Sequence, residues 1–194
     1  MRPARLAALA LFLLTAACGR QDSGGHATDI TGAMPALDFS MTRANDGKAV
    51  SAADYRGKVV ILYFGYTHCP DICPTTLANL SEAFGKLGGR AGDVRVLFVT
   101  VDPNRDALAL MKGYVNSFAP QIDGLRGTPD QLTALARRYR VAYSVTPESP
   151  GHPYEVMHSN AVFFFDRSGR ARLVATATDN NAALTADLTR LLDM

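Results

Sequence analysis

The sequence predicts an α/β domain with a central β-sheet and flanking helices. Two runs, KVVILYFGY at 58–66 and DVRVLFVTVDP at 93–103, are apolar almost throughout and rich in β-branched residues, which is typical of strands buried on both faces. Each run is followed by a segment with the apolar period of an amphipathic helix. At 194 residues, 47% of them hydrophobic, the chain is long enough for one domain with a sizeable core.

The first 17 residues have the composition of a secretory signal peptide. Arg2 and Arg5 precede an apolar run at 6–17, which is too short to span a bilayer comfortably and ends in small residues. A cysteine directly after two alanines resembles the bacterial lipobox, in which the cysteine is lipidated and becomes the new N-terminus. We therefore expect Cys18 to carry a lipid that anchors the protein to the cell membrane in the bacterial periplasm. A cleaved soluble form and an uncleaved N-terminal anchor are the alternatives.

A flexible tether is expected between this signal segment and the folded domain. Residues 18–33 are polar, rich in glycine and without apolar periodicity, so the domain is predicted over 34–194. Removal of residues 1–17 takes away two arginines and no acidic residue, which lowers the formal charge from +2 to 0. A near-neutral domain without a basic block lacks the electrostatic footprint of a nucleic-acid-binding protein.

The N-terminal half of the domain is expected to contain a hairpin, the two buried strands and two helices. Residues 37–50 predict a hairpin that turns at Asn45-Asp46-Gly47. The second buried strand leads into a helix over 105–118, which ends before Pro120. The first buried strand leads into a helix that stops at Gly88-Gly89. One face of that helix carries its apolar residues, Leu77, Leu80, Phe84 and Leu87.

The C-terminal half predicts two further helices and two strands. Residues 128–131, TPDQ, form a capping box with proline at the first helical position and open a helix through Tyr139. Three prolines exclude regular structure from 146–154. Two strands and a last amphipathic helix follow at 155–166, 171–178 and 180–193. Strand, helix, strand, helix, then a hairpin and a helix is the order of elements in a thioredoxin-like fold.

The motif GYTHCPDICP at 65–74 places Cys69 and Cys73 between a buried strand and a helix. Unpaired amide groups and the helix dipole stabilise thiolates at a helix N-terminus, which favours both redox and metal chemistry. Residues four apart on a regular helix have Cβ atoms about 5–6 Å apart, whereas a disulfide needs about 3.8 Å. Two thiolates bound to one metal at about 2.3 Å each span a wider gap. The spacing therefore favours a metal site, and the proline after each cysteine leaves an oxidised pair open.

A third ligand would come from one of four histidines. His26 falls in the tether, and His68 and His152 fall in loops, where a solvent-exposed histidine is the ordinary state. His158 lies at the start of a core strand, where it is either a polar strand-end residue or a ligand. Two thiolates and one imidazole suit Cu(I) and tolerate Cu(II), whereas structural zinc normally takes four ligands and no fourth is evident. Met157 is expected to pack in the core, because adjacent strand residues point to opposite faces.

Three segments in this order resemble the SCO/SenC family, thioredoxin-fold copper proteins that help to assemble the CuA centre of cytochrome c oxidase: GYTHCPDICP at 65–74, VTVDPNRD at 99–106 and MHSNAVFFFDRSG at 157–169. The resemblance covers about residue 34 to the C-terminus. It implies that copper, as Cu(I) or Cu(II), is bound by Cys69, Cys73 and His158. It also implies the CuA domain of cytochrome c oxidase subunit II as the recipient, and another periplasmic copper chaperone as a donor.

The resemblance extends to an acidic segment after the second buried strand. Asp102 matches the aspartate of the family's VDPxRD segment, which is linked to the metal-site surface or to partner contact. A turn or helix-capping role before Pro103 explains Asp102 equally well. Arg105 and Asp106 match the same segment, and a surface ion pair at a helix start accounts for both.

The thiol pair has two functions that are compatible with this resemblance. A metallochaperone passes copper on by ligand exchange and needs His158. A thiol–disulfide reductase would use Cys69 and Cys73 to keep the CuA cysteines of the partner reduced, and it does not need the histidine. A general thioredoxin-like oxidoreductase is disfavoured by the extra residue between the cysteines, and a peroxiredoxin by the absence of its peroxidatic motif. A structural disulfide would close a very small loop and contribute little chain entropy.

Overall fold

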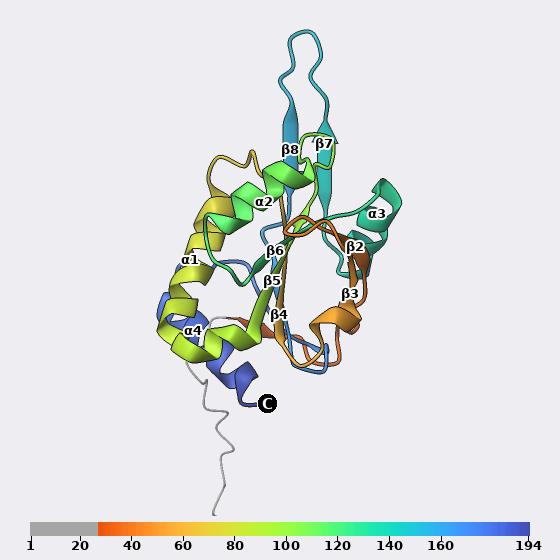
Figure 1. The fold of residues 1–194 in the computed structure, drawn as a ribbon. Coiled ribbons are helices and arrows are strands. Elements are labelled where there is room, and N and C mark those ends of the chain that lie inside the picture. Colours follow the sequence, from red (N-terminus) through yellow and green to blue (C-terminus); the bar gives the residue numbers. More distant parts are fainter. Residues whose placement is uncertain (1–26) are drawn as a thin grey trace, which may run out of the picture.

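An eight-stranded mixed β-sheet forms the centre of the domain, with its strands in the order β1-β10-β9-β4-β5-β6-β2-β3 (Figure 1). The computed structural model describes residues 27–194. The sheet consists of β1 (Thr28–Asp29), β2 (Ser40–Arg43), β3 (Ala49–Ser51), β4 (Val59–Gly65), β5 (Val94–Thr100), β6 (Ile122–Arg126), β9 (Val162–Phe165) and β10 (Ala171–Ala175). A second sheet consists of β7 (Tyr143–Thr146) and β8 (Glu155–His158). The helices are α1 (Ile72–Leu87), α2 (Leu108–Asn116), α3 (Pro129–Arg138) and α4 (Asn181–Leu192), with short 3-10 helices η1 (Ala52–Tyr55) and η2 (Gly88–Asp93).

The folded domain begins before residue 34. Thr28 and Asp29 pair with Val174 and Leu173 of β10, so the tether expected over 18–33 is wrong for this part. An exposed edge strand is held by backbone hydrogen bonds, and a polar segment shows no apolar pattern that would reveal it. The signal peptide, Cys18 and His26 lie outside the described residues. Within residues 27–194, no helix is both long and apolar enough to cross a membrane.

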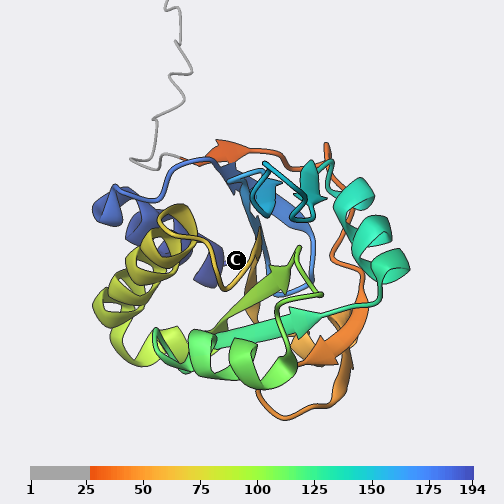
Figure 2. The same cartoon turned by 90° about the horizontal axis from the view of Figure 1, so that it is seen from above.

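The strand β4 lies at the centre of the sheet with every residue buried. It pairs in parallel with β5 and antiparallel with β9. Alternate side chains of β4 enter two separate cores, one formed with α1, α2 and α4 and the other with α3 and β2. Figure 2 shows these two groups of elements on opposite sides of the sheet. Layers on both faces explain why the strand is apolar throughout, as predicted.

Most predicted elements are confirmed, including the N-terminal hairpin, which forms β2 and β3 at one edge of the sheet. The predicted capping box is present, since the Thr128 Oγ1 accepts from the Gln131 amide at 3.2 Å and the Gln131 Oε1 accepts from the Thr128 amide at 2.8 Å. The helix expected over 105–118 begins only at Leu108, because the preceding segment turns back on the carbonyl of Asp102. Strand β6 is an element that the sequence did not predict.

The chain between β7 and β9 departs most from the sequence prediction. The single strand expected over 155–166 is two strands: β8 pairs with β7, and β9 pairs with β4 and β10. The proline loop joins β7 and β8 into a ribbon that projects from the domain (Figure 1). A bridge between Ser149 and His152 continues this ribbon into the loop, which the prolines were expected to exclude. We call residues 143–158 the arm.

Candidate metal centre

Two neighbouring cysteines and a histidine that is far from them in the sequence meet at the carboxyl end of β4. Cys69 lies in the loop after β4, Cys73 lies in the first turn of α1, and His158 is the last residue of β8. One donor atom from each residue lies within 4.8 Å of the other two. The Cys73 Sγ is 3.4 Å from the His158 Nε2. In the described part of the chain, no other group of three such side chains could hold a metal ion.

A buried carboxylate holds the loop that carries Cys69. Asp106 is fully buried and accepts hydrogen bonds from the Thr67 amide at 3.0 Å, the Thr67 hydroxyl at 2.6 Å and the Thr100 hydroxyl at 2.6 Å. The surface ion pair expected for Arg105 and Asp106 is therefore wrong. Arg105 pairs with Asp102 instead. Sequence reasoning missed both threonines, because a hydroxyl that binds a distant carboxylate leaves no local pattern.

Gly65, at the end of β4, leaves room for the sulfur of Cys73. A Cβ atom at position 65 would lie 2.7 Å from the Cys73 Sγ and 2.6 Å from the ring of Phe98. Both distances are too short for real contacts between these atoms, so any side chain here would displace the sulfur or the ring. The first residue of the cysteine motif therefore shapes the metal centre.

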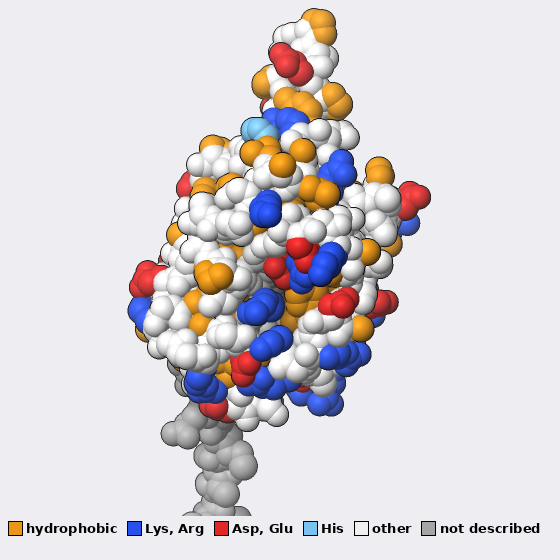
Figure 3. All heavy atoms as spheres, viewed as in Figure 1, with side chains coloured by type: hydrophobic (Ala, Val, Ile, Leu, Met, Phe, Trp, Pro, Cys, Tyr) orange, Lys and Arg blue, Asp and Glu red, His pale blue; other side chains and the backbone are white. Residues whose placement is uncertain are grey.

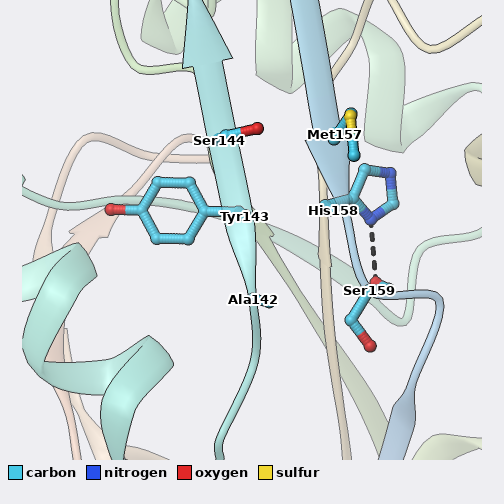
Figure 4. Close-up of a pocket in the computed structure, with 6 residues that line it drawn as sticks. All are labelled: Ala142, Tyr143, Ser144, Met157, His158 and Ser159. Atoms are coloured by element: carbon cyan, nitrogen blue, oxygen red, sulfur yellow. Dashed lines mark hydrogen bonds between the residues drawn. The ribbon is translucent and has the colours of Figure 1, made fainter.

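The imidazole of His158 is oriented with its Nε2 toward the thiols. Its Nδ1 lies 2.9 Å from the carbonyl oxygen of Ser159, and Figure 4 shows this contact. Because a carbonyl can only accept, the Nδ1 carries the proton and the Nε2 presents a lone pair. Burial lowers the pKa of His158 below its usual value of 6.5, because it disfavours the cation. The imidazole is therefore neutral at neutral pH, which is the form that binds metals.

The two cysteines are free thiols in unequal surroundings. Cys73 is fully buried, and burial is the main cause that raises its pKa to about 12. At Cys73, burial thus outweighs the helix N-terminus, whose amide groups and dipole were expected to stabilise the thiolate. Cys69 is half-buried, and its Sγ accepts a hydrogen bond of 3.4 Å from the amide of Cys73. A metal ion that binds Cys73 must displace its proton.

The three donors fit a copper ion with few ligands. Metal–sulfur bonds of about 2.3 Å place two sulfurs of one ion at most about 4.6 Å apart, so donors within 4.8 Å need only small adjustments. Two sulfurs and an imidazole form a soft set, which suits copper better than magnesium or calcium. Within the described residues, His68 and His152 are exposed and stay outside the group, so a closed four-ligand zinc site does not form.

Asp102 ties the arm to the rest of the domain. It is fully buried, and its Oδ1 accepts a hydrogen bond of 2.7 Å from the hydroxyl of Tyr154 in the arm. Its Oδ2 accepts from the Nε of Arg105, whose guanidinium also lies 3.8 Å from the centre of the Tyr154 ring. Tyr154 precedes β8, the strand that ends at His158. The expected turn is also present, since the carbonyl of Asp102 accepts from the amides of Arg105 and Asp106. A role of Asp102 in contact with a partner stays a prediction.

Met157 is exposed, and the expectation that it packs in the core is wrong. The residue is 68% exposed, because the arm is a two-stranded ribbon and no layer formed by residues 27–194 covers this face. With His158 and four neighbours it lines a cavity of about 400 Å³ (Figure 4). It also lines a groove of about 510 Å³ between the arm and the loop that carries Cys69. Two open hollows therefore flank the metal centre.

Comparison with known proteins finds similarity to one family. The SCO1/SenC family model matches residues 30–193. The mitochondrial SCO2 homolog of Bos taurus is 41% identical over 152 residues, which cover 74% of this chain and 57% of that protein. The mitochondrial SCO1 homolog 1 of Arabidopsis thaliana is 44% identical over 126 residues, which cover 64% of this chain and 37% of that protein. The chain therefore spans about half the length, or less, of these curated relatives.

Solved structures show the same fold. The structure of Bradyrhizobium japonicum ScoI with copper bound has a TM-score of 0.72 at 37% identity and covers 80% of this chain and 98% of its own. Yeast Sco1 with copper bound has a TM-score of 0.72 at 31% identity and covers 81% of this chain and 87% of its own. These similarities confirm the predicted thioredoxin-like fold with a central sheet and flanking helices.

Proposed function

Because the chain belongs to the SCO1/SenC family, we propose that it is a metallochaperone that binds copper through Cys69, Cys73 and His158. The observation that carries this proposal is the approach of the His158 Nε2 to the Cys73 Sγ at 3.4 Å, which joins the arm to the start of α1. Two related proteins solved with copper bound support the choice of metal. The soft donor set supports it independently.

The proposed recipient is the CuA domain of cytochrome c oxidase subunit II during assembly of the oxidase. Transfer would proceed by ligand exchange, in which a ligand of the recipient binds the ion before a ligand of the donor leaves. Three protein ligands leave room for such an incoming fourth ligand. Cys69 is half-buried whereas Cys73 is fully buried, so exchange would begin at Cys69 and Cys73 would leave last.

The proposed location is the bacterial periplasm, with a lipid on Cys18 as the anchor to the cell membrane. The basic, apolar and small-residue pattern over 1–18 supports this proposal. A polar, glycine-rich segment between Cys18 and β1 would let the domain reach a membrane-bound recipient. Another periplasmic copper chaperone is the proposed donor.

The face around the metal centre is the proposed docking surface for the recipient. Ile72, beside Cys73, is 43% exposed, and Met157, beside His158, is 68% exposed. Exposed apolar side chains that gather into one patch mark interaction surfaces, whereas single ones are ordinary. In the space-filling view, apolar side chains gather around the base of the arm (Figure 3). The two hollows beside the arm add concave surface to the same face.

A thiol–disulfide reductase is the second candidate function. The observation that favours it is a pair of free thiols, one half-buried and one fully buried. Cys69 would attack a disulfide of the partner, and Cys73 would then displace the partner's thiol and close a Cys69–Cys73 disulfide. Two electrons and two protons pass to the partner's cysteines in this exchange. His158 takes no part in it.

Two parallel assays separate these functions. In the first assay, the copper-loaded protein is mixed with a reduced, metal-free CuA domain, and the visible absorption of CuA is followed. In the second assay, the metal-free protein is mixed with the same domain in its disulfide form, and free thiols of that domain are counted. We expect His158→Ala to abolish copper transfer and leave disulfide reduction intact. Copper transfer that survives His158→Ala would contradict the metallochaperone and favour the reductase.

A further inference from the structure

We propose that Tyr63 tunes the metal centre: its phenol donates a hydrogen bond to the sulfur of Cys73 and weakens the donation of electrons from that sulfur to bound copper. Tyr63 is thus a positioning residue, which acts on copper through a ligand and does not touch the ion. This inference rests on the proposed function, since it requires copper at Cys73.

The geometry of the contact carries the inference. Tyr63 lies in β4, two residues before Gly65, and its hydroxyl is 3.6 Å from the Cys73 Sγ. Sulfur is a large acceptor, so its hydrogen bonds are longer than those to oxygen. Both residues are fully buried, with exposed fractions of 0%. Water therefore does not compete for either group, and the hydrogen bond acts at its full strength.

The direction of this hydrogen bond is fixed when a metal is bound. In the metal-free protein, either the thiol or the phenol has a proton to donate. A sulfur bound to copper has lost its proton, so only the phenol remains as a donor.

A hydrogen bond to a ligating sulfur changes the preference of the site for the two copper oxidation states. It withdraws electron density from the sulfur, and Cu(II) depends more than Cu(I) on strong donation by thiolate. The Tyr63 hydroxyl should therefore favour Cu(I) over Cu(II). The other sulfur, that of Cys69, is half-buried and lies near a backbone amide at 3.4 Å. The phenol thus makes the two thiolates unequal in their donor strength.

Tyr114 provides a matched control in the same aromatic cluster. Its ring centre lies 5.5 Å from that of Phe98, which in turn lies 6.0 Å from that of Tyr63. The Tyr114 hydroxyl is buried and has no hydrogen-bond partner within the described residues. Tyr114→Phe therefore removes a buried hydroxyl from the same cluster without breaking a hydrogen bond to either cysteine.

The test compares the full-chain parent, Tyr63→Phe and Tyr114→Phe, each purified in detergent and checked for its fold by circular dichroism. The affinities for Cu(I) and Cu(II) are measured by competition, together with the sulfur-to-Cu(II) charge-transfer band. We expect Tyr63→Phe to raise the ratio of Cu(II) to Cu(I) affinity by about 10-fold, the size typical for loss of a partner behind a metal ligand. Its band should move to longer wavelength. Tyr114→Phe should match the parent in both readouts.

A second variant keeps the test decisive if Tyr63→Phe does not fold. Incorporation of 3-fluorotyrosine at position 63 makes the phenol a stronger donor and should move the band and the ratio in the opposite direction. An unchanged band and ratio in the folded Tyr63→Phe protein, or an equal shift in Tyr114→Phe, would overturn the inference while the proposed function stands. A parent that binds no copper would instead contradict the proposed function, and this inference with it.

Discussion

The Nε2 of His158 lies 3.4 Å from the Sγ of Cys73, although 85 residues separate them in the chain. Two different parts of the fold produce this contact. Strand β4 and helix α1 fix the sulfur, and the arm fixes the imidazole. Because the arm is a separate two-stranded sheet, its attachment to the domain decides how well the third ligand is held. The metal centre therefore depends on contacts that lie outside its three ligands.

The hydrogen bond from Tyr154 to Asp102 gives the first prediction. Tyr154→Phe removes the hydroxyl that donates to the buried Asp102 at 2.7 Å and loosens the arm. We expect Cu(I) affinity to fall by about 10-fold, because a support of the ligand His158 is lost. Ser144→Ala is the control, since it removes a hydroxyl from an exposed position of the same arm. Competition titration of both variants measures these affinities. Equal affinities in the two would contradict the claim that this hydrogen bond supports His158.

The loop that carries Cys69 should depend on Asp106. Asp106→Asn replaces an oxygen that accepts hydrogen bonds by an amide that cannot, in a buried site where three donors meet the carboxylate. We expect the free energy of unfolding to fall by about 2 kcal/mol or more, as for other lost hydrogen bonds to buried charges. Asp71→Asn, at an exposed position, should change it by less than about 0.5 kcal/mol. Denaturant titration measures both, and an Asp106→Asn protein as stable as the parent would contradict this role.

Local sequence pattern was sufficient for much of the core. The run of seven buried residues in β4 and the capping box between Thr128 and Gln131 are determined by neighbours in the chain, so they could be predicted. Strand β6 could not, because Asp123 and Gly124 interrupt its apolar pattern. The structure buries Asp123 against the hydroxyl of Tyr55 at 2.8 Å, a partner 68 residues away. Long-range polar contacts of this kind leave no periodic signal.

The candidate site shows the same limit. The spacing of Cys69 and Cys73 indicated a metal or redox pair, but His158 stood out from the other histidines only through the family resemblance. The residues behind the ligands, Tyr63 and Tyr154, were missed because their partners, 10 and 52 positions away, lie in other elements of the fold and leave no local pattern. The exposure of Met157 was also missed, since a strand pattern does not tell whether a second layer covers it.

Stability in acid should report on Asp166 in the turn between β9 and β10. Its burial alone would raise the pKa, but hydrogen bonds from Ser168, Arg170 and Arg172 outweigh burial and lower it from 3.8 to about 2. Because the pKa of Asp166 is lower in the folded state, its ionisation stabilises the folded protein at every pH above the pKa of the unfolded state, here by about 2 kcal/mol. This contribution should be lost as the pH falls from about 4 to about 2.

Unfolding titrations between pH 2 and pH 7 test this expectation. Asp166→Asn should be less stable than the parent at neutral pH, and the difference should disappear toward pH 2. The exposed Asp179, changed to Asn, serves as the control and should follow the parent at every pH. A constant difference between Asp166→Asn and the parent across this range would contradict the assignment.

Substitutions on the docking surface should slow copper transfer without changing copper affinity. Met157→Ser and Ile72→Ser each remove an exposed apolar side chain beside a ligand without changing the ligand itself. We expect Cu(I) affinity to stay near that of the parent, while the rate of transfer to a CuA domain falls several-fold. Met194→Ser is the control, because Met194 is 62% exposed and the C-terminus lies at the end of the domain opposite the arm (Figure 1). Transfer that is as fast in the two variants as in the control would place the recipient elsewhere.

The most direct test of the metal centre is a Cu(I) competition titration of the reduced full-chain protein beside His158→Ala and His152→Ala. His152 is the matched control, because it is an exposed histidine in the same arm. The parent should bind one Cu(I) with a Kd near 1 pM or tighter, which corresponds to about −16 kcal/mol. His158→Ala should lose about 100-fold or more in affinity, at the upper end for a disturbed metal site, and His152→Ala should show no change. A His158→Ala protein that binds Cu(I) as tightly as the parent would contradict the central claim and leave copper as an incidental ligand of two reactive thiols.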